Sequence, residues 1–177
     1  MKTFVSTLII IVILSAPALG DETNSLVKPL EALRPFIGKT WKGEFKNSTP
    51  ENPKVDIQKW ERALNGKAVR ITHSINNGSY GGESIVMVNP KTSQVEFHYF
   101  TTAGFSTHGT MEVEGRKLIT NEEVTGDANG TTKVKGTTEL LSDGKMRVKT
   151  SYFKNGAWEE GRDMVYQESP QAQVTFK

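Results

Sequence analysis

Residues 58–75 read QKWERALNGKAVRITHSI, and the fold expected for the whole chain can be inferred from this segment outward. Apolar and polar side chains alternate on either side of Asn65-Gly66. Asn-Gly is strongly favoured in two-residue hairpin turns because both turn positions need a positive φ. Such a turn places Trp60 opposite Ile71, so the stretch is expected to form a β-hairpin.

Turn signals of the same kind recur along the rest of the chain, and the segments between them alternate as strands do. The expected strands are 40–47, 54–63, 67–75, 79–88, 94–101, 105–114, 117–125, 131–141, 145–153 and 157–167. A meander of ten strands has two exposed edges, which disappear when the sheet closes on itself. The sequence therefore predicts an all-β fold, a ten-stranded up-and-down antiparallel barrel, over residues 21–168.

The segment ahead of the first strand predicts one short helix. Its apolar residues recur at the spacing of one helical face: Leu26, Leu30, Leu33 and Ile37. Pro35 limits the end of this helix, because the residue before a proline is disfavoured in helical conformation.

The first twenty residues, MKTFVSTLIIIVILSAPALG, have the pattern of a secretory signal peptide. Lys2 supplies a positive charge, residues 8–14 are an aliphatic run, and Ala18 and Gly20 are the small residues before the cleavage site. The run is shorter than the roughly 20 apolar residues of a membrane-spanning helix. We therefore expect residues 1–20 to be cleaved and the protein to be exported, periplasmic or secreted.

Composition narrows the class of protein further. The chain has 177 residues, enough for one domain, with 22 Lys and Arg against 20 Asp and Glu and no cysteine. The near-neutral balance argues against a nucleic-acid partner. The lack of cysteine excludes disulfides and thiolate zinc sites, which in an exported protein favours a bacterial origin. Residues 169–177 form a polar C-terminal tail whose composition permits disorder.

The hairpin in residues 58–75 also indicates which side chains face the barrel interior. One face carries Gln58, Trp60, Arg62, Val69, Ile71, His73 and Ile75. This apolar face with a few embedded polar groups is typical of a ligand cavity. The alternative is a packed core in which Arg62 lies at the barrel rim and His73 is simply hydrogen-bonded.

The register of the last hairpin decides whether Arg162 faces the interior. A three-residue loop over 154–156 places Trp158, Arg162 and Tyr166 on one inner face with apolar partners. A two-residue loop would turn Arg162 outward beside Lys149. We favour the three-residue loop because it avoids facing two cations.

Strands 94–101 and 105–114 place His98 directly across from His108, while Tyr99 points to the opposite face. The histidine face is the more polar one. Two histidines without a fixed third ligand are a weak metal signal, so we expect an exposed polar pair and no metal site.

The chain resembles calycin-like barrels, the group that includes lipocalins, fatty-acid-binding proteins and nitrobindins. The similarity begins with GKTWKGEF (38–45) after the short helix, which resembles the G-x-W-x-G-type opening. It continues with WERALNGK (60–67), GGE (81–83), NPKT (89–92) and MVY (164–166). Their order resembles a bacterial domain-of-unknown-function family of such barrels over nearly all of 30–167. The resemblance implies an interior cavity, and it implies that Trp41 closes one barrel end against the N-terminal segment.

The sequence differs in two respects from fatty-acid-binding proteins and nitrobindins. The connection over 48–53 is too short for the helix pair of fatty-acid-binding proteins, and Arg162 and Tyr166 are four apart instead of forming Arg-x-Tyr. Nitrobindins hold haem through a late histidine, and this chain has none beyond His108. No cofactor is therefore expected.

We expect a protein that binds a small apolar or amphipathic ligand, with no assigned catalytic residue. The candidate cavity lining is Trp60, Arg62, His73, Tyr99, Trp158, Arg162 and Tyr166. One alternative is a structural or interaction scaffold with a filled barrel. The other is an enzyme that uses His73 with Asp56 as an acid–base pair, although no G-x-S-x-G or H-E-x-x-H motif occurs.

Overall fold

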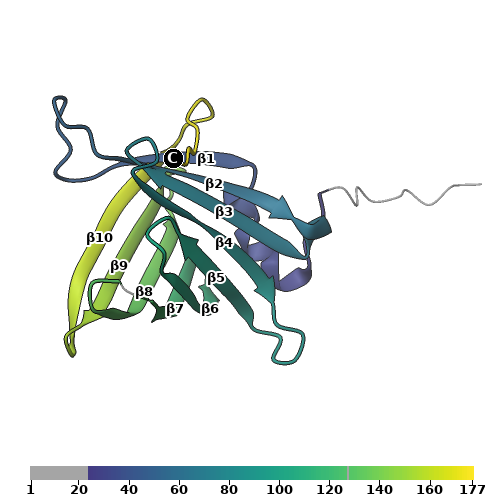
Figure 1. The fold of residues 1–177 in the computed structure, drawn as a ribbon. Coiled ribbons are helices and arrows are strands. Elements are labelled where there is room, and N and C mark those ends of the chain that lie inside the picture. The colour runs from purple at the N-terminus through teal and green to yellow at the C-terminus, as the bar shows by residue number, and fades with distance from the viewer. Residues whose placement is uncertain (1–23, 127) are drawn as a thin grey trace, which may run out of the picture.

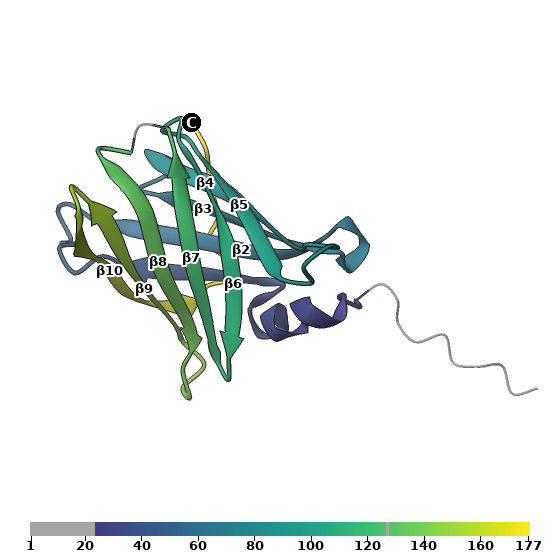
Figure 2. The same ribbon diagram turned by 90° about the horizontal axis from the view of Figure 1, so that it is seen from below.

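The computed structural model describes residues 24–126 and 128–177, so the expected signal peptide lies outside the described residues. Within them, ten antiparallel strands form a closed barrel and a 3₁₀ helix, η1 (Lys28–Phe36), precedes the first strand (Figures 1 and 2). The strands are β1 (Lys39–Glu44), β2 (Val55–Ala63), β3 (Ala68–Ile75), β4 (Tyr80–Val88), β5 (Val95–Thr101), β6 (Ser106–Glu114), β7 (Lys117–Thr125), β8 (Thr131–Leu140), β9 (Met146–Lys154) and β10 (Ala157–Glu168).

Each strand pairs with its neighbours along the chain, and β1 closes the barrel against β10 between Trp41↔Glu168 and Gly43↔Tyr166. The predicted all-β, up-and-down barrel is therefore confirmed. Every predicted strand end lies within three residues of the observed one. Among the described residues, no helix has the length and apolar character needed to cross a bilayer.

The N-terminal helix differs from the expected one in its period. Its buried side chains are Leu30, Leu33 and Phe36, whereas Leu26 and Ile37 are only partly buried. A 3₁₀ helix has three residues per turn, so its apolar stripe repeats every three residues and not at α-helical spacing. The two ends of the predicted stripe, Leu26 and Ile37, therefore lie outside η1, although both pack against the core.

Helix η1 lies across one end of the barrel (Figure 2). Phe36 packs against Trp60 with ring centroids 5.1 Å apart, and Trp41 is completely buried, its Nε1 donating to the Phe36 carbonyl at 3.4 Å. Burying a side chain such as Leu30 or Phe36 is worth about 1.5–3 kcal/mol. The sequence thus closes this end of the barrel with apolar packing.

The β2–β3 register agrees with the prediction, since Trp60 lies opposite Ile71 and Gln58 opposite His73. The turn itself is longer, because residues 64–66 form the 3₁₀ turn η2 (Leu64–Gly66). Gly66 has φ 82°, and a Cβ there would lie 2.0 Å from the Ser25 carbonyl oxygen. The turn therefore needs glycine to let the N-terminal segment approach.

The last hairpin departs from the favoured register. Ala157 pairs with Lys154 and Trp158 with Phe153, so the loop has two residues, and the three-residue loop was wrong. The register then shifts between Glu160 and Asp163, which is a β-bulge. Because a shift of one residue exchanges the two faces of a strand, the bulge returns Arg162 to the interior despite the two-residue loop.

The polar tail, residues 169–177, lies against the barrel. Ser169 N donates to the Thr40 carbonyl at 2.7 Å, and Thr175 N donates to Ser74 Oγ at 3.1 Å. The C-terminus consequently lies beside the β3–β4 turn, near Gly78 (Figure 1).

Candidate functional site: a cavity inside the barrel

A cavity of about 250 Å³ lies inside the barrel and is lined by residues of β2 to β10 and of the β5–β6 connection. Its lining combines two kinds of side chain. The apolar ones are Trp60, Ile71, Val86, Phe97, Phe105, Met111, Val134 and Val148. Those with hydroxyl groups include Tyr80, Ser84, Tyr99, Thr107, Thr120, Thr138, Thr150 and Tyr152.

A second hollow of about 460 Å³ lies at the barrel end opposite η1, where it reaches residues 128–129 of the β7–β8 loop. The two hollows have five lining residues in common: Tyr80, Phe105, Val134, Tyr152 and Arg162. The interior cavity therefore adjoins the loop end of the barrel, whereas η1 covers the other end.

A buried carboxylate, Asp56 on β2, organises one wall of the interior. Its side chain is inaccessible to solvent. Arg162 Nη1 donates to Asp56 Oδ2 at 2.8 Å, and the Tyr166 hydroxyl donates to the same oxygen at 2.7 Å. His73 Nδ1 lies 3.0 Å from the other oxygen, Oδ1. Three side chains from two other strands thus converge on one carboxylate.

The hydrogen-bond chain continues from His73 towards the cavity. His73 Nε2 lies 2.7 Å from the Tyr99 hydroxyl, which lies 3.1 Å from the Tyr80 hydroxyl. When Nδ1 carries the proton and donates to Asp56, Nε2 accepts from Tyr99. The chain therefore ends with tyrosine hydroxyls that line the cavity.

The charges of this wall balance each other. Burial alone would raise the pKa of Asp56, but the hydrogen bond with His73, the nearby Arg162 cation and the hydrogen bond from Tyr166 hold that pKa below its ordinary value. Burial acts against the Arg162 cation, yet the pKa of Arg162 is raised because Tyr166 and Asp56 outweigh burial. Asp56 and Arg162 therefore form a neutral buried pair.

The bulge in β10 is what places Arg162 in this network. Arg162 N donates to Thr150 Oγ1 at 2.8 Å. Gly161 beside it has no side chain, and a Cβ there would lie 2.4 Å from the Tyr152 ring. An isolated glycine inside a strand is a recognised signal for a bulge, and this signal was present in the sequence but was not used in predicting the register.

The sequence-predicted site residues separate into two groups. Trp60, His73, Tyr99 and Arg162 line the cavity, and Tyr166 lies behind Arg162, whose Nη1 donates to its hydroxyl at 2.9 Å. Arg62 does not line the cavity, because its Nε donates to the Ser25 carbonyl at 2.7 Å near the η1 end.

Trp158 does not line the interior cavity either. It lies before the bulge, where the two-residue loop turns it outward, and 43% of its surface is exposed. Its ring packs on Phe153, and Lys135 Nζ lies 4.6 Å above it. Placing Trp158 and Arg162 on one inner face was therefore wrong, because the bulge separates them.

Glu122 on β7 is a cavity residue that the sequence analysis did not single out. Its carboxyl accepts hydrogen bonds from Thr107 Oγ1 at 2.7 Å and Thr120 Oγ1 at 3.5 Å. Burial raises its pKa, and the two threonine hydrogen bonds only partly oppose this effect. Its position on the inward-facing phase of β7, with Thr120 two residues before it, was the available signal.

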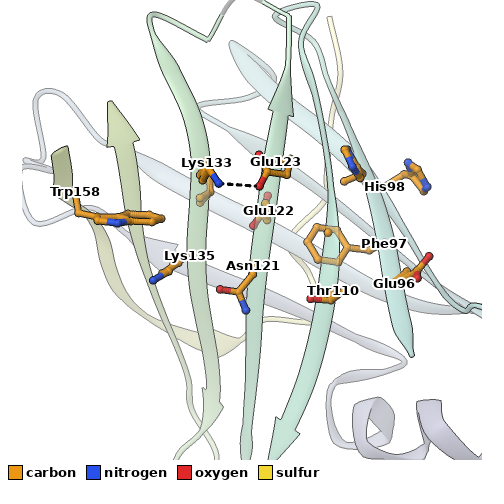
Figure 3. Close-up of a pocket in the computed structure, with 13 residues that line it drawn as sticks. Glu96, Phe97, His98, Thr110, Asn121, Glu122, Glu123, Lys133, Lys135 and Trp158 are labelled. Carbon is orange, nitrogen blue, oxygen red and sulfur yellow. Dashed lines mark ion pairs between the residues drawn. The ribbon is translucent and has the colours of Figure 1, made fainter. Parts of the chain in front are cut away.

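A hollow of about 610 Å³ lies against strands β5 to β8, on the side where Lys133 Nζ pairs with Glu123 Oε1 at 3.2 Å (Figure 3). His98 lies opposite His108 as predicted, with stacked rings 6.0 Å apart. In the part of the chain that the structure describes, no group of three or more His, Cys, Asp or Glu side chains is placed to hold a metal ion.

Comparison with known proteins adds no assignment: no family model matches the chain, and no curated protein matches it.

Proposed function

We propose that this protein is an exported, calycin-like barrel that binds one small amphipathic molecule in its interior cavity. The observation that supports this most is the cavity, which lies between an apolar lining and a wall of tyrosine hydroxyls. Ligand sites in proteins are mostly apolar with a few placed polar groups, and they often lie inside β-barrels. If the barrel were only a structural scaffold, its interior would be expected to be filled by side chains.

The volume limits the size of the ligand. An apolar cavity of about 150 Å³ accommodates benzene, whereas drug-sized ligands occupy roughly 300–1,000 Å³. The cavity of about 250 Å³ suits a single substituted ring or a short branched chain. A long fatty acid exceeds this volume unless its chain also extends into the adjoining hollow at the loop end.

Binding is tested with benzyl alcohol, a neutral ring with one hydroxyl, by isothermal titration calorimetry. The variant Ser84→Phe fills the cavity from β4, and Glu83→Phe places the same ring outside on the same strand, because neighbouring strand residues point to opposite faces. We expect S84F to weaken binding at least tenfold and E83F to retain it. Equal binding by S84F and the wild type would disprove the interior site, and absence of binding by the wild type would favour the scaffold.

The native ligand and the export step are tested on the same preparation. Full-length protein expressed in a secreting bacterial host is recovered from the periplasm, and its mass is measured under native and denaturing conditions. A denatured mass equal to that of a chain beginning at Asp21 supports signal cleavage. Extra mass that is lost on denaturation identifies the ligand class, and a chain retaining residues 1–20 in the cytoplasm would contradict export.

An enzyme is the second candidate, because His73 is oriented by Asp56 at 3.0 Å as catalytic imidazoles are. However, Nε2 faces Tyr99 at 2.7 Å, so a substrate would have to exchange its proton through the tyrosine chain or displace it. This role is tested by screening for a substrate that the wild type converts and then measuring the variant His73→Ala. A variant that retains the activity would exclude His73 as the acid–base residue.

A further inference from the structure

The cavity lining contains one carboxyl group that no cation balances. Among the described residues that line the cavity, Glu122 is the only acidic side chain. Its hydrogen-bond donors are two neutral threonine hydroxyls. No described Lys, Arg or His side chain forms an ion pair with it, whereas Asp56 is balanced by Arg162.

The topology keeps Glu122 away from the Asp56 network. In the closed barrel, four strands separate β7 from β2 in either direction, so the two carboxyl groups lie on opposite walls. Both walls face the same cavity, since Glu122 lines it together with His73 and Arg162. Arg162 already donates to Asp56 and Tyr166 and is held there by the bulge in β10.

A buried carboxyl group without a cation is costly, because burial disfavours the charged form. A ligand that brings its own positive charge removes this cost when it binds, and hydrogen bonds to charged groups are stronger than neutral ones. An anionic ligand would instead meet the uncompensated carboxyl group of Glu122 on the β7 wall.

Resting on the proposed interior site, we propose that Glu122 is the specificity-determining residue of the cavity and that the ligand is a small protonated amine. The ammonium group of the ligand lies against Glu122 on β7, and its apolar body lies among the aromatic and aliphatic side chains. This arrangement selects amines by attraction and rejects carboxylates by repulsion.

The test compares three ligands of nearly the same shape: benzylamine, benzyl alcohol and benzoate. Their dissociation constants are measured at pH 7.5 with the wild type, Glu122→Gln and Glu123→Gln. Glu123 is the matched control because it is the next residue on β7, faces outward and pairs with Lys133. Circular dichroism confirms that each variant is folded.

We expect the wild type to bind benzylamine about tenfold more tightly than benzyl alcohol, and not to bind benzoate measurably. In E122Q the ratio of the benzylamine and benzyl alcohol constants is expected to fall to about one, and in E123Q to remain as in the wild type.

The two proposals fail in different ways. Binding of benzyl alcohol without preference for benzylamine would overturn the amine inference and leave the interior site standing. A preference that E122Q retains would equally overturn the role of Glu122. A wild type that binds none of the three ligands would overturn the proposed function itself.

Discussion

At the residue scale, the fold depends on how each buried charge is balanced. Asp56 is inaccessible to solvent and is held by Arg162, His73 and Tyr166. Breaking a buried pair by removing one partner leaves the other charge uncompensated, at a cost of roughly 3–5 kcal/mol. Asp56→Asn is therefore expected to lower the free energy of unfolding by about that amount in urea denaturation.

Asp163→Asn is the matched control for this substitution. Asp163 accepts two hydrogen bonds from Arg147 at 2.9 and 2.8 Å on the outer face, and these bonds lower its pKa to about 2. Because solvent screens this pair, its removal is expected to destabilise the protein far less than Asp56→Asn. Similar losses in the two variants would contradict the central role of Asp56.

The contribution of Glu122 to the free energy of unfolding is expected to change with pH in the opposite direction to that of Asp56, because the pKa of Glu122 is raised and that of Asp56 is lowered. Burial raises its pKa in the folded state, so between the unfolded and folded pKa values the native state binds more protons. Glu122 therefore makes its whole contribution to stability below the pKa it has in the unfolded chain. This contribution is lost as the pH rises through the pKa it has in the folded state. Without ligand, Glu122→Gln is therefore expected to unfold at a higher temperature than the wild type at pH 8.

The measurement for Glu122 is thermal unfolding of the wild type and E122Q at pH 4, 6 and 8. The advantage of E122Q is expected to shrink towards pH 4, where the wild-type carboxyl is also neutral. An advantage that is constant with pH would show that the variant acts through packing and not through the charge of Glu122.

At the scale of the element, hairpins were predictable where their two strands are regular. The β2–β3 register followed from the alternation around Asn65-Gly66, and it survived a different turn geometry because the loop is symmetric about that dipeptide. The β9–β10 register was missed because loop length and bulge act together. A register argument assumes strict alternation, and Gly161 ends that alternation midway along β10.

Gly161→Ala tests whether the absence of a side chain maintains the bulge. The new Cβ would lie 2.4 Å from the Tyr152 ring and 2.6 Å from Thr150 Oγ1, the group that accepts from Arg162 N. We expect a loss of about 1–3 kcal/mol, as for overpacked sites. Glu159→Ala, at an exposed position on the same strand, is expected to change stability by less than about 0.5 kcal/mol. Equal effects in urea denaturation would contradict the requirement for glycine.

At the scale of the whole molecule, closure of the barrel was predictable because an open ten-stranded meander leaves two unpaired edges. The cavity was predictable only as an inner face, in which His73, Tyr99 and Trp60 were included correctly. The pairing of charged side chains across the barrel was not predictable from the local sequence pattern. Asp56, Arg162 and Glu122 lie far apart in sequence, and only the closed order of strands shows which of them meet.

Closure also makes ligand binding a property of the whole fold. A ligand that binds only the native state at one hundred times its Kd adds about 2.7 kcal/mol to the free energy of unfolding. For a barrel of this size, that corresponds to a rise in Tm of roughly 5–11 °C. Benzylamine at this concentration is expected to raise the Tm of the wild type and E83F by this amount, in differential scanning fluorimetry.

The location of the bound amine determines which variant loses this rise. If benzylamine occupies the interior, Ser84→Phe abolishes the rise. Trp158→Ala leaves it unchanged, because Trp158 lines the hollow of about 610 Å³ and not the interior cavity. The reverse result would place the amine beside Trp158 and the outward Glu123, and would contradict an interior site. Because stabilisation by mass action is the same wherever the ligand binds, the rise in Tm alone does not locate the ligand, and this pair of variants separates the inside of the barrel from its outer wall.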